Sequence, residues 1–312
     1  MAKLHPQIEQ VLAAMAKLEL RPIEAMTPTE ARAQMEQMAA SRRAEPLPTA
    51  RIEDRAIPGP AGPIPVRIYW PQAPGPRPAI AYYHGGGHVI GSLDSHDLVA
   101  RNLCGGAEAV VLSVDYRMGP EHRFPAAVED SFAALEWLHA NAASLGADAE
   151  RLGVHGDSAG GNLAAVVAIL ARDRGGPRLR LQSLVYPVCD FRMRSESYGR
   201  YATGCGILTA EAMKWFRGHY LRTLDDAADW RASPGLAPDL AGVAPAIVIA
   251  AECDVLHDEG LAYAERLKAA GVAVEYRRYA GMIHAFFGMM PNVDDALNAQ
   301  RAVWAAFRRA FD

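Results

Sequence analysis

The chain has 312 residues, of which half are hydrophobic and 22% are charged, as is typical of a soluble globular protein. Its 32 Lys and Arg against 36 Asp and Glu give a formal net charge of −4 and a pI near 6.2, which argue against nucleic acid or an anionic membrane surface as the main partner. The longest apolar run, 163–171, is far too short to cross a membrane, and charges between Lys3 and Glu19 interrupt any signal segment, so we expect a cytoplasmic protein without membrane insertion.

The first 45 residues predict helices. Apolar side chains recur there at helical spacing, at Ile8, Val11, Leu12, Met15 and Leu18. A second helix is expected to begin at Thr27, because Pro28 suits the first helical position and Glu30 can complete a capping box.

From Pro48 onward, short β-rich runs alternate with helical patterns, which predicts an α/β fold with a mostly parallel sheet covered on both faces. The predicted strands are 64–70, 79–83, 109–116, 152–155, 181–188, 246–251 and 272–279. The predicted helices between them are 126–141, 159–172 and 259–270. Residues 190–230 break the alternation, with one helix predicted over 210–224, and we expect them to be an insertion above the sheet.

The four cysteines show no metal-binding spacing. No C-x-x-C pair occurs among them, since they stand at Cys104, Cys189, Cys205 and Cys253, and the sequence has no H-E-x-x-H motif. We therefore expect neither a metal nor another cofactor. Scattered thiols of this kind are typical of buried, reduced core residues.

Residues 156–160 read Gly-Asp-Ser-Ala-Gly, a G-x-S-x-G pattern between a predicted strand and a predicted helix. This is the setting of a nucleophile elbow, in which glycines allow the strand and the helix to approach closely. Ser158 would then stand at a helix N-terminus, where backbone N–H groups favour negative charge. The alternative is a glycine-rich turn with a bystander serine.

Residues 84–87 read His-Gly-Gly-Gly and follow the predicted strand 79–83. Acyl transfer needs N–H donors aimed at the developing oxyanion, and this loop supplies them in lipases and esterases, together with the N–H after the nucleophile, here that of Ala159. A nucleotide-phosphate loop does not fit. Ile90 stands where a dinucleotide fingerprint needs glycine, and Asn162-Leu163 stand where a Walker loop needs Lys and Ser or Thr.

A serine nucleophile needs a base and an orienting acid, which follow it in that fold in the order Asp or Glu, then His. Asp254 follows the predicted strand 246–251, and His284 follows the predicted strand 272–279. The neighbouring competitors are Glu252, which we place at the strand end, and His257 and Asp258, which lie further toward a helix.

Four separated motifs resemble those of the hormone-sensitive-lipase-like (bacterial family IV) carboxylesterases. They are the His-Gly-Gly-Gly loop, Asp-Tyr-Arg at 115–117 with Pro-Glu-His-Arg-Phe-Pro-Ala at 120–126, Gly-Asp-Ser-Ala-Gly-Gly-Asn at 156–162, and Asp-Val-Leu at 254–256 with Asp-Glu-Gly at 258–260. The resemblance implies an α/β-hydrolase core, 46–189 and 231–312, under a helical cap made of 1–45 and the insertion 190–230.

By the same resemblance, Ser158, Asp254 and His284 would form the catalytic triad. The oxyanion hole would comprise N–H groups of Gly86, Gly87 and Ala159, with Gly85 keeping the loop tight and His84 fixing it by hydrogen bonds. One departure from the family is His88, in place of an aromatic residue, from which we expect a more polar wall of the acyl pocket. Two others, Met118-Gly119 and Ala285, remove no catalytic group.

A group of charged residues and a group of methionines are expected to have structural roles near the site. We expect Asp115, Arg117, Glu121 and Asp130 to form structural ion pairs near the site. Met15, Met26, Met35 and Met38 would either line a flexible acyl pocket or only pack the cap.

The predicted activity is hydrolysis of short- to medium-chain acyl esters, because a cap bounds the pocket. The partner is a small-molecule ester, and a homodimer through the edge strand 272–279 is possible. Two alternatives stay open. An amidase or deacetylase would use the same triad, and a non-catalytic binder, such as the plant gibberellin receptors of this family, would lack the triad histidine, which is present here as His284.

Overall fold

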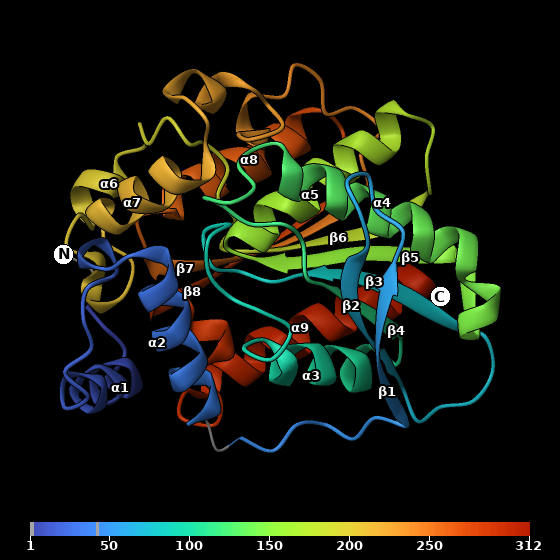
Figure 1. Ribbon diagram of the computed structural model, residues 1–312, viewed down its shortest axis with the longest axis horizontal. Coiled ribbons are helices and arrows are strands. Elements are labelled where there is room, and N and C mark those ends of the chain that lie inside the picture. Colours follow the sequence, from blue (N-terminus) through green and yellow to red (C-terminus); the bar gives the residue numbers. More distant parts are fainter. Residues whose placement is uncertain (1–2, 42–43) are drawn as a thin grey trace.

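The structure, a computed structural model, describes residues 3–41 and 44–312. Eight strands form one sheet in the order β1-β2-β4-β3-β5-β6-β7-β8, in which β2 runs antiparallel to both its neighbours and all other pairs are parallel (Figure 1). The strands are β1 (Arg51–Ile57), β2 (Ile64–Trp70), β3 (Arg77–Tyr83), β4 (Val110–Val114), β5 (Ala147–Asp157), β6 (Leu179–Val185), β7 (Ala246–Cys253) and β8 (Val274–Ile283).

Helices cover both faces of this sheet, as the alternating pattern predicts. On one face lie α4 (Ala126–Asn141), α5 (Ala159–Asp173) and α8 (His257–Ala269), and on the other α3 (Asp97–Ala107) and α9 (Asp294–Phe311) (Figure 1). The central strands are therefore buried on both sides, which is why β4 is a continuous apolar-rich run rather than an alternating one.

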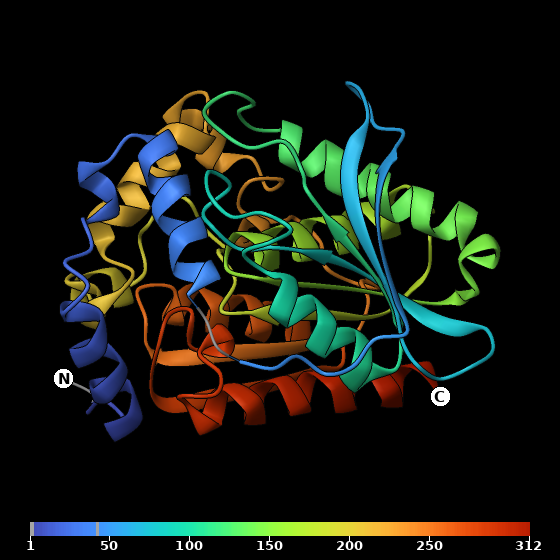
Figure 2. The ribbon, with the colours of Figure 1, turned by 60° about the horizontal axis from the view of Figure 1, so that its bottom comes forward.

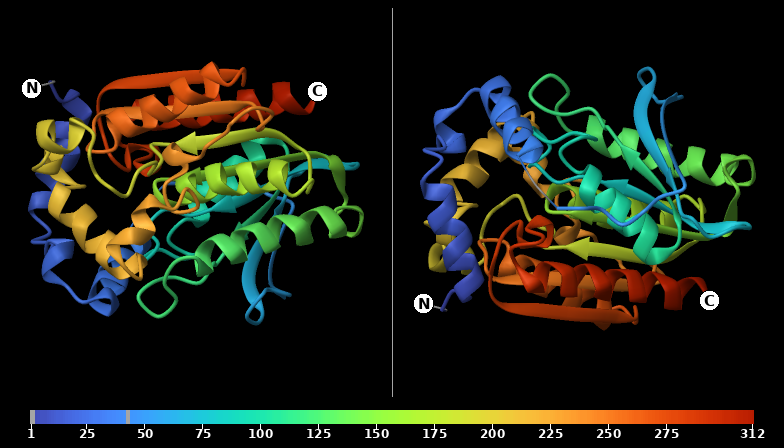
Figure 3. Two further views of the ribbon diagram at one scale, coloured as in Figure 1. Left: turned by 90° about the horizontal axis from the view of Figure 1, so that it is seen from above. Right: turned by 90° about the horizontal axis from the view of Figure 1, so that it is seen from below.

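The remaining helices gather at the end of the sheet toward which the parallel strands run (Figures 2 and 3). We call α1 (Pro6–Ala16), α2 (Pro28–Ala40), α6 (Ser197–Arg200) and α7 (Ala210–Tyr220) the helical layer. Two segments far apart in sequence meet in it, because the indole N–H of Trp215 donates to the carbonyl of Met26 at 3.1 Å. The capping box predicted at Thr27 and Glu30 is present. Of the predicted segment 1–45, residues 1–2 and 42–43 lie outside the described residues.

Most predicted elements are present with shifted ends, and four of the helices and strands named above were not predicted. Strand β5 is longer than predicted, β8 continues to Ile283, and the helix predicted over 210–224 ends at Tyr220. No sequence pattern predicted β1, α3, α6 or α9. In α3, glycines weaken the helical signal, but Gly106 is required there because a side chain would overlap the Trp304 ring of α9. Along the described chain, no helix has both the length and the apolar character needed to cross a membrane.

Candidate active site

The turn from β5 into α5 holds Ser158 in a strained conformation, with φ 56° and ψ −117°. Both flanking glycines are required, because a Cβ on Gly156 would overlap the carbonyl of Gly160, and a Cβ on Gly160 would overlap the carbonyl of Tyr83. The neighbouring strand β6 stabilises this conformation, because Ser158 N donates a hydrogen bond to Val185 O at 2.8 Å. The turn therefore has the geometry expected of a nucleophile elbow.

Ser158, His284 and Asp254 form a continuous chain of hydrogen bonds. His284 Nε2 lies 2.9 Å from Ser158 Oγ, and His284 Nδ1 lies 2.7 Å from Asp254 Oδ2. The carboxylate of Asp254 accepts a further bond from Leu256 N at 3.0 Å, and all three side chains are buried. Because a carboxylate only accepts, Nδ1 carries the imidazole proton and Nε2 is free to accept the proton of the serine hydroxyl.

The competing acidic and basic residues point elsewhere. Glu252 is the penultimate residue of β7 and accepts a hydrogen bond from Gly281 N at 2.8 Å. His257 Nδ1 lies 2.9 Å from the carbonyl of Ala251, and Asp258 pairs with a surface arginine at 3.4 Å. None of these contacts reaches the serine.

The loop after β3 has a shape that only glycine permits at two positions. Gly86 has φ 115° and Gly87 has φ 62°. A Cβ on Gly86 would overlap the carbonyl of Ile90, and a Cβ on Gly87 would overlap the ring of Phe216 on α7. Gly86, Gly87 and Ser158 line the same cavity, so the structure brings the predicted oxyanion loop to the serine.

His84 anchors this loop from within the core, as the resemblance implies. Its Nδ1 lies 2.7 Å from Gly85 O, and Tyr116 donates its hydroxyl proton to His84 O at 2.7 Å. Burial, with the neighbouring charge of His96, lowers the pKa of His84 to about 3, so the ring is neutral at pH 7 and its Nδ1–H donates.

The prediction for His88 is wrong. Its ring is fully buried, stacks on Tyr220 with 3.9 Å between ring centroids, and is not among the residues that line the cavity. Burial, followed by the charge of His84, lowers the pKa of His88 to about 3. The side chain therefore packs as a neutral aromatic ring beneath α7 and does not make the pocket wall more polar.

Above the serine lies a cavity of about 520 Å³ with a largely apolar lining. Side chains of the helical layer form much of its wall, and all four methionines singled out in the sequence contribute to it. The apolar lining from the described residues includes Met15, Met26, Met35, Met38, Ile90, Val99, Ile207, Leu208, Met213, Phe216 and Phe287.

The predicted ion pairs near the site are formed in two cases. Arg117 pairs with the buried Asp130 at 2.8 Å, and Glu121 pairs with Arg32 of α2 at 2.6 Å. For Asp115 no ion pair is seen among the described residues, and burial raises the pKa of its carboxyl.

Cysteine and metal chemistry find no support at the site. Burial, with the thiol of Cys205 beside it, raises the pKa of Cys253 to about 12, so this thiol stays protonated at neutral pH. Within residues 3–41 and 44–312, no group of three His, Cys, Asp or Glu side chains is placed to hold a metal ion.

A family model described as the alpha/beta hydrolase fold matches residues 80–288. The chain belongs to the hormone-sensitive-lipase-like family of α/β hydrolases. It is 48% identical over 244 residues to the carboxylic ester hydrolase LipN of Mycobacterium tuberculosis, which covers 76% of this chain and 65% of LipN. It is 41% identical over 280 residues to the ethyl acetate hydrolase of Pseudomonas putida, covering 88% of each chain.

Among solved structures, the hyperthermophilic esterase of Pyrobaculum calidifontis superimposes with a TM-score of 0.92 at 42% identity, covering 98% of each chain. The predicted fold and enzyme class are therefore confirmed, and the chain is a serine esterase that acts on small ester molecules. The comparisons favour neither the amidase nor the binder alternative.

Proposed function

We propose that the chain hydrolyses short- to medium-chain acyl esters through an acyl-enzyme on Ser158. The observation that carries this proposal is the unbroken hydrogen-bonded chain from Ser158 Oγ through His284 to Asp254. These three residues, which the sequence predicts as the triad, are the catalytic residues of the proposal.

In the first half of the reaction, His284 Nε2 takes the proton of Ser158 as Oγ attacks the ester carbonyl. Asp254 keeps His284 in the required tautomer and stabilises the imidazolium that forms. The N–H groups of Gly86, Gly87 and Ala159 bind the tetrahedral oxyanion, and they act without reorganisation because the loop is already folded. Collapse of this intermediate breaks the bond to the alcohol, which leaves with the proton from His284.

In the second half, water attacks the acyl-enzyme with His284 again as the base. The products are the carboxylic acid and the free serine. Gly85 has a supporting role in this scheme, because a side chain at this position would overlap the carboxylate of Asp157 and displace the oxyanion loop.

The size and lining of the cavity support a short or medium acyl chain. A space of about 520 Å³ with a mostly apolar wall fits a compact ester better than an extended lipid. The relative from Pseudomonas putida is named for ethyl acetate, which agrees with a small substrate. We also propose the predicted division into a cap, 1–45 and 190–230, and a core, 46–189 and 231–312. The homodimer through the edge strand and the cytoplasmic location stay predictions.

The test is the hydrolysis of p-nitrophenyl esters from acetate to palmitate by the wild type and by Ser158→Ala. We expect activity that peaks at short chains and a loss of about 10⁴- to 10⁶-fold in kcat in the variant. A fluorophosphonate probe should label the wild type and not the variant. Equal rates in both enzymes would refute Ser158 as the nucleophile, and labelling without ester hydrolysis would point to an amide substrate.

A further inference from the structure

A carboxylate lies directly behind the proposed oxyanion loop. Asp157 ends β5 next to Ser158, its Oδ1 accepts a hydrogen bond from the Tyr82 hydroxyl at 3.0 Å, and its Oδ2 occupies the space that a side chain at Gly85 would need. Asp157 also lines the active-site cavity. Burial alone would raise the pKa of Asp157, but His96, His155 and Tyr82 outweigh it and lower this pKa to about 2, so the group is an anion at neutral pH.

The side chain that faces this carboxylate is that of His96, which also lines the cavity. His96 Nε2 lies 3.8 Å from Asp157 Oδ2. His96 Nδ1 lies 2.9 Å from Ser95 Oγ, whose own proton is donated to the carbonyl of Ser92 at 3.1 Å. The His96 ring is therefore held between the hydroxyl of Ser95 and the carboxylate of Asp157.

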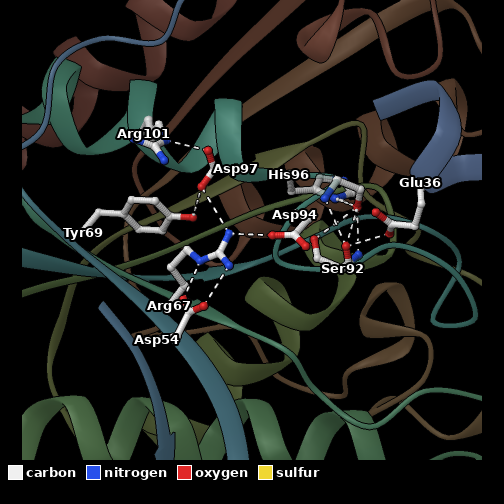
Figure 4. A network of polar contacts seen from close by, with 10 residues as sticks. Glu36, Asp54, Arg67, Tyr69, Ser92, Asp94, His96, Asp97 and Arg101 are labelled. Carbon is white, nitrogen blue, oxygen red and sulfur yellow. Dashed lines mark hydrogen bonds and ion pairs between the residues drawn. The ribbon is translucent and has the colours of Figure 1, made fainter. Parts of the chain in front are cut away.

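The same contacts continue to the helical layer. Ser92 donates its hydroxyl proton to Glu36 of α2 at 2.7 Å, and Ser92 N donates to Ser95 Oγ at 2.8 Å (Figure 4). Figure 4 shows Glu36, Ser92 and His96 in one cluster, while Asp94 of the same loop turns to the opposite side and pairs with Arg67 at 2.8 Å. The position of His96 is therefore fixed by neighbours on its own loop and by a helix that covers the cavity.

An uncompensated anion in this place would oppose the reaction. The transition state places negative charge on the substrate oxygen at Gly86 and Gly87, on the other side of the loop that Asp157 touches. Two like charges repel strongly where water is largely excluded, and donors preorganised for an oxyanion lose their advantage if a fixed anion lies close by.

We propose that His96 and Asp157 are a positioning pair for the esterase reaction, in which the carboxylate supports the oxyanion loop from behind and the His96 ring that faces it offsets its charge toward the oxyanion. This inference rests on the proposed function of Ser158 and the loop. Neither residue touches the reacting atoms, and their effect is exerted through Gly85 and the field at the oxyanion.

The test is a double-mutant cycle of His96→Gln, Asp157→Asn and the two combined, with p-nitrophenyl butyrate as substrate. Glutamine removes the imidazole ring of His96 and retains an N–H donor. We expect His96→Gln to lower kcat about 10- to 100-fold with little change in KM, because the effect acts on the transition state. The double variant should be faster than His96→Gln alone, because the anion that opposes the oxyanion has been removed.

A second readout is the inhibition constant of an aryl trifluoromethyl ketone, which forms a tetrahedral oxyanion on the serine. It should rise in His96→Gln by the factor lost in kcat/KM and fall again in the double variant. The matched control is Asp94→Asn, which alters the charge two residues away in the same loop and should retain the kcat of the wild type.

Three results would overturn the inference: wild-type kcat in His96→Gln, a double variant no faster than His96→Gln, or a loss confined to KM and thermal stability. If glutamine prevents folding, His96→Asn takes its place in the cycle. Failure of the proposed function would look different, because the wild type itself would then neither hydrolyse the ester nor bind the ketone.

Discussion

Replacing Gly86 by alanine is the most direct test of the oxyanion loop. The backbone of Gly86 has φ 115°, a region that residues with a side chain rarely adopt. The new methyl group would also overlap the carbonyl of Ile90, which is part of the backbone and cannot rotate away. Ile90 is also tied to the loop, since its N–H donates to Gly86 O at 2.9 Å. The loop itself must therefore move.

The expected loss follows from these two effects. Holding alanine in an unfavourable backbone region costs about 1 to 3 kcal/mol, which should appear as a lower free energy of unfolding. If the loop relieves the overlap by turning the Gly86 N–H away from the substrate, one oxyanion donor is lost. Loss of one such donor lowers kcat by about 10²- to 10³-fold. We therefore expect a large fall in kcat, a small change in KM and a modest fall in stability.

The assay compares kcat, KM and the free energy of unfolding in urea for the wild type, Gly86→Ala and a matched glycine variant. The control is Gly218→Ala in α7, where a new Cβ meets no atom within 4 Å and alanine should stabilise the helix by about 0.5 to 1 kcal/mol. A Gly86→Ala enzyme that loses stability but retains the kcat of the wild type would refute the placement of the oxyanion at this loop.

Three other changes test separate parts of the structure. Asp254→Asn should lower kcat about 10⁴-fold at pH 7, because His284 loses its orienting anion. Asp258→Asn, which changes a surface ion pair, should retain the kcat of the wild type. Equal activity of the two variants would contradict the assignment of Asp254. Phe216→Ala opens the cavity wall beside Gly87 and should shift the preferred p-nitrophenyl ester to longer acyl chains, and an unchanged preference would count against this wall as the limit. Burial raises the pKa of Glu259 to about 8, above its unfolded value of 4.5, so its contribution to stability is present below pH 4.5 and lost as pH rises through 8. The thermal midpoint of Glu259→Gln should therefore depend less on pH over this range than that of the wild type. Parallel curves of midpoint against pH for the two proteins would contradict this reasoning.

Much of the candidate site could be predicted from the sequence because its signals are local. The elbow and the oxyanion loop depend on glycines at fixed spacing, and each follows directly from a buried strand whose pattern is strong. Asp254 and His284 could be placed because parallel strands end at the same edge of a sheet, so residues after successive strands meet there. In the folded chain these residues meet through the contacts at 2.7 and 2.9 Å.

The parts that were missed depend on contacts between distant segments. His88 was expected in the pocket wall, but its φ of 61° turns the ring into the core. No local sequence pattern predicts that backbone conformation. The partner of His96 across the fold, Asp157, is identified only when β5 and the loop before α3 are brought together. The edge strand β1 is rich in charged residues and lacks the alternation that marks a half-buried strand.

The proposed oxyanion loop is held by contacts on three sides and not by its glycines alone. From the core, Tyr116 holds the carbonyl of His84, and from behind, Asp157 fills the space beside Gly85. From above, Arg32 of α2 donates to Val89 O at 2.8 Å. Glycines make such a loop possible but leave it many conformations, so its neighbours must select one. The helix α2, which contributes to the cavity wall, is thus also one of the elements that hold the proposed oxyanion donors in place.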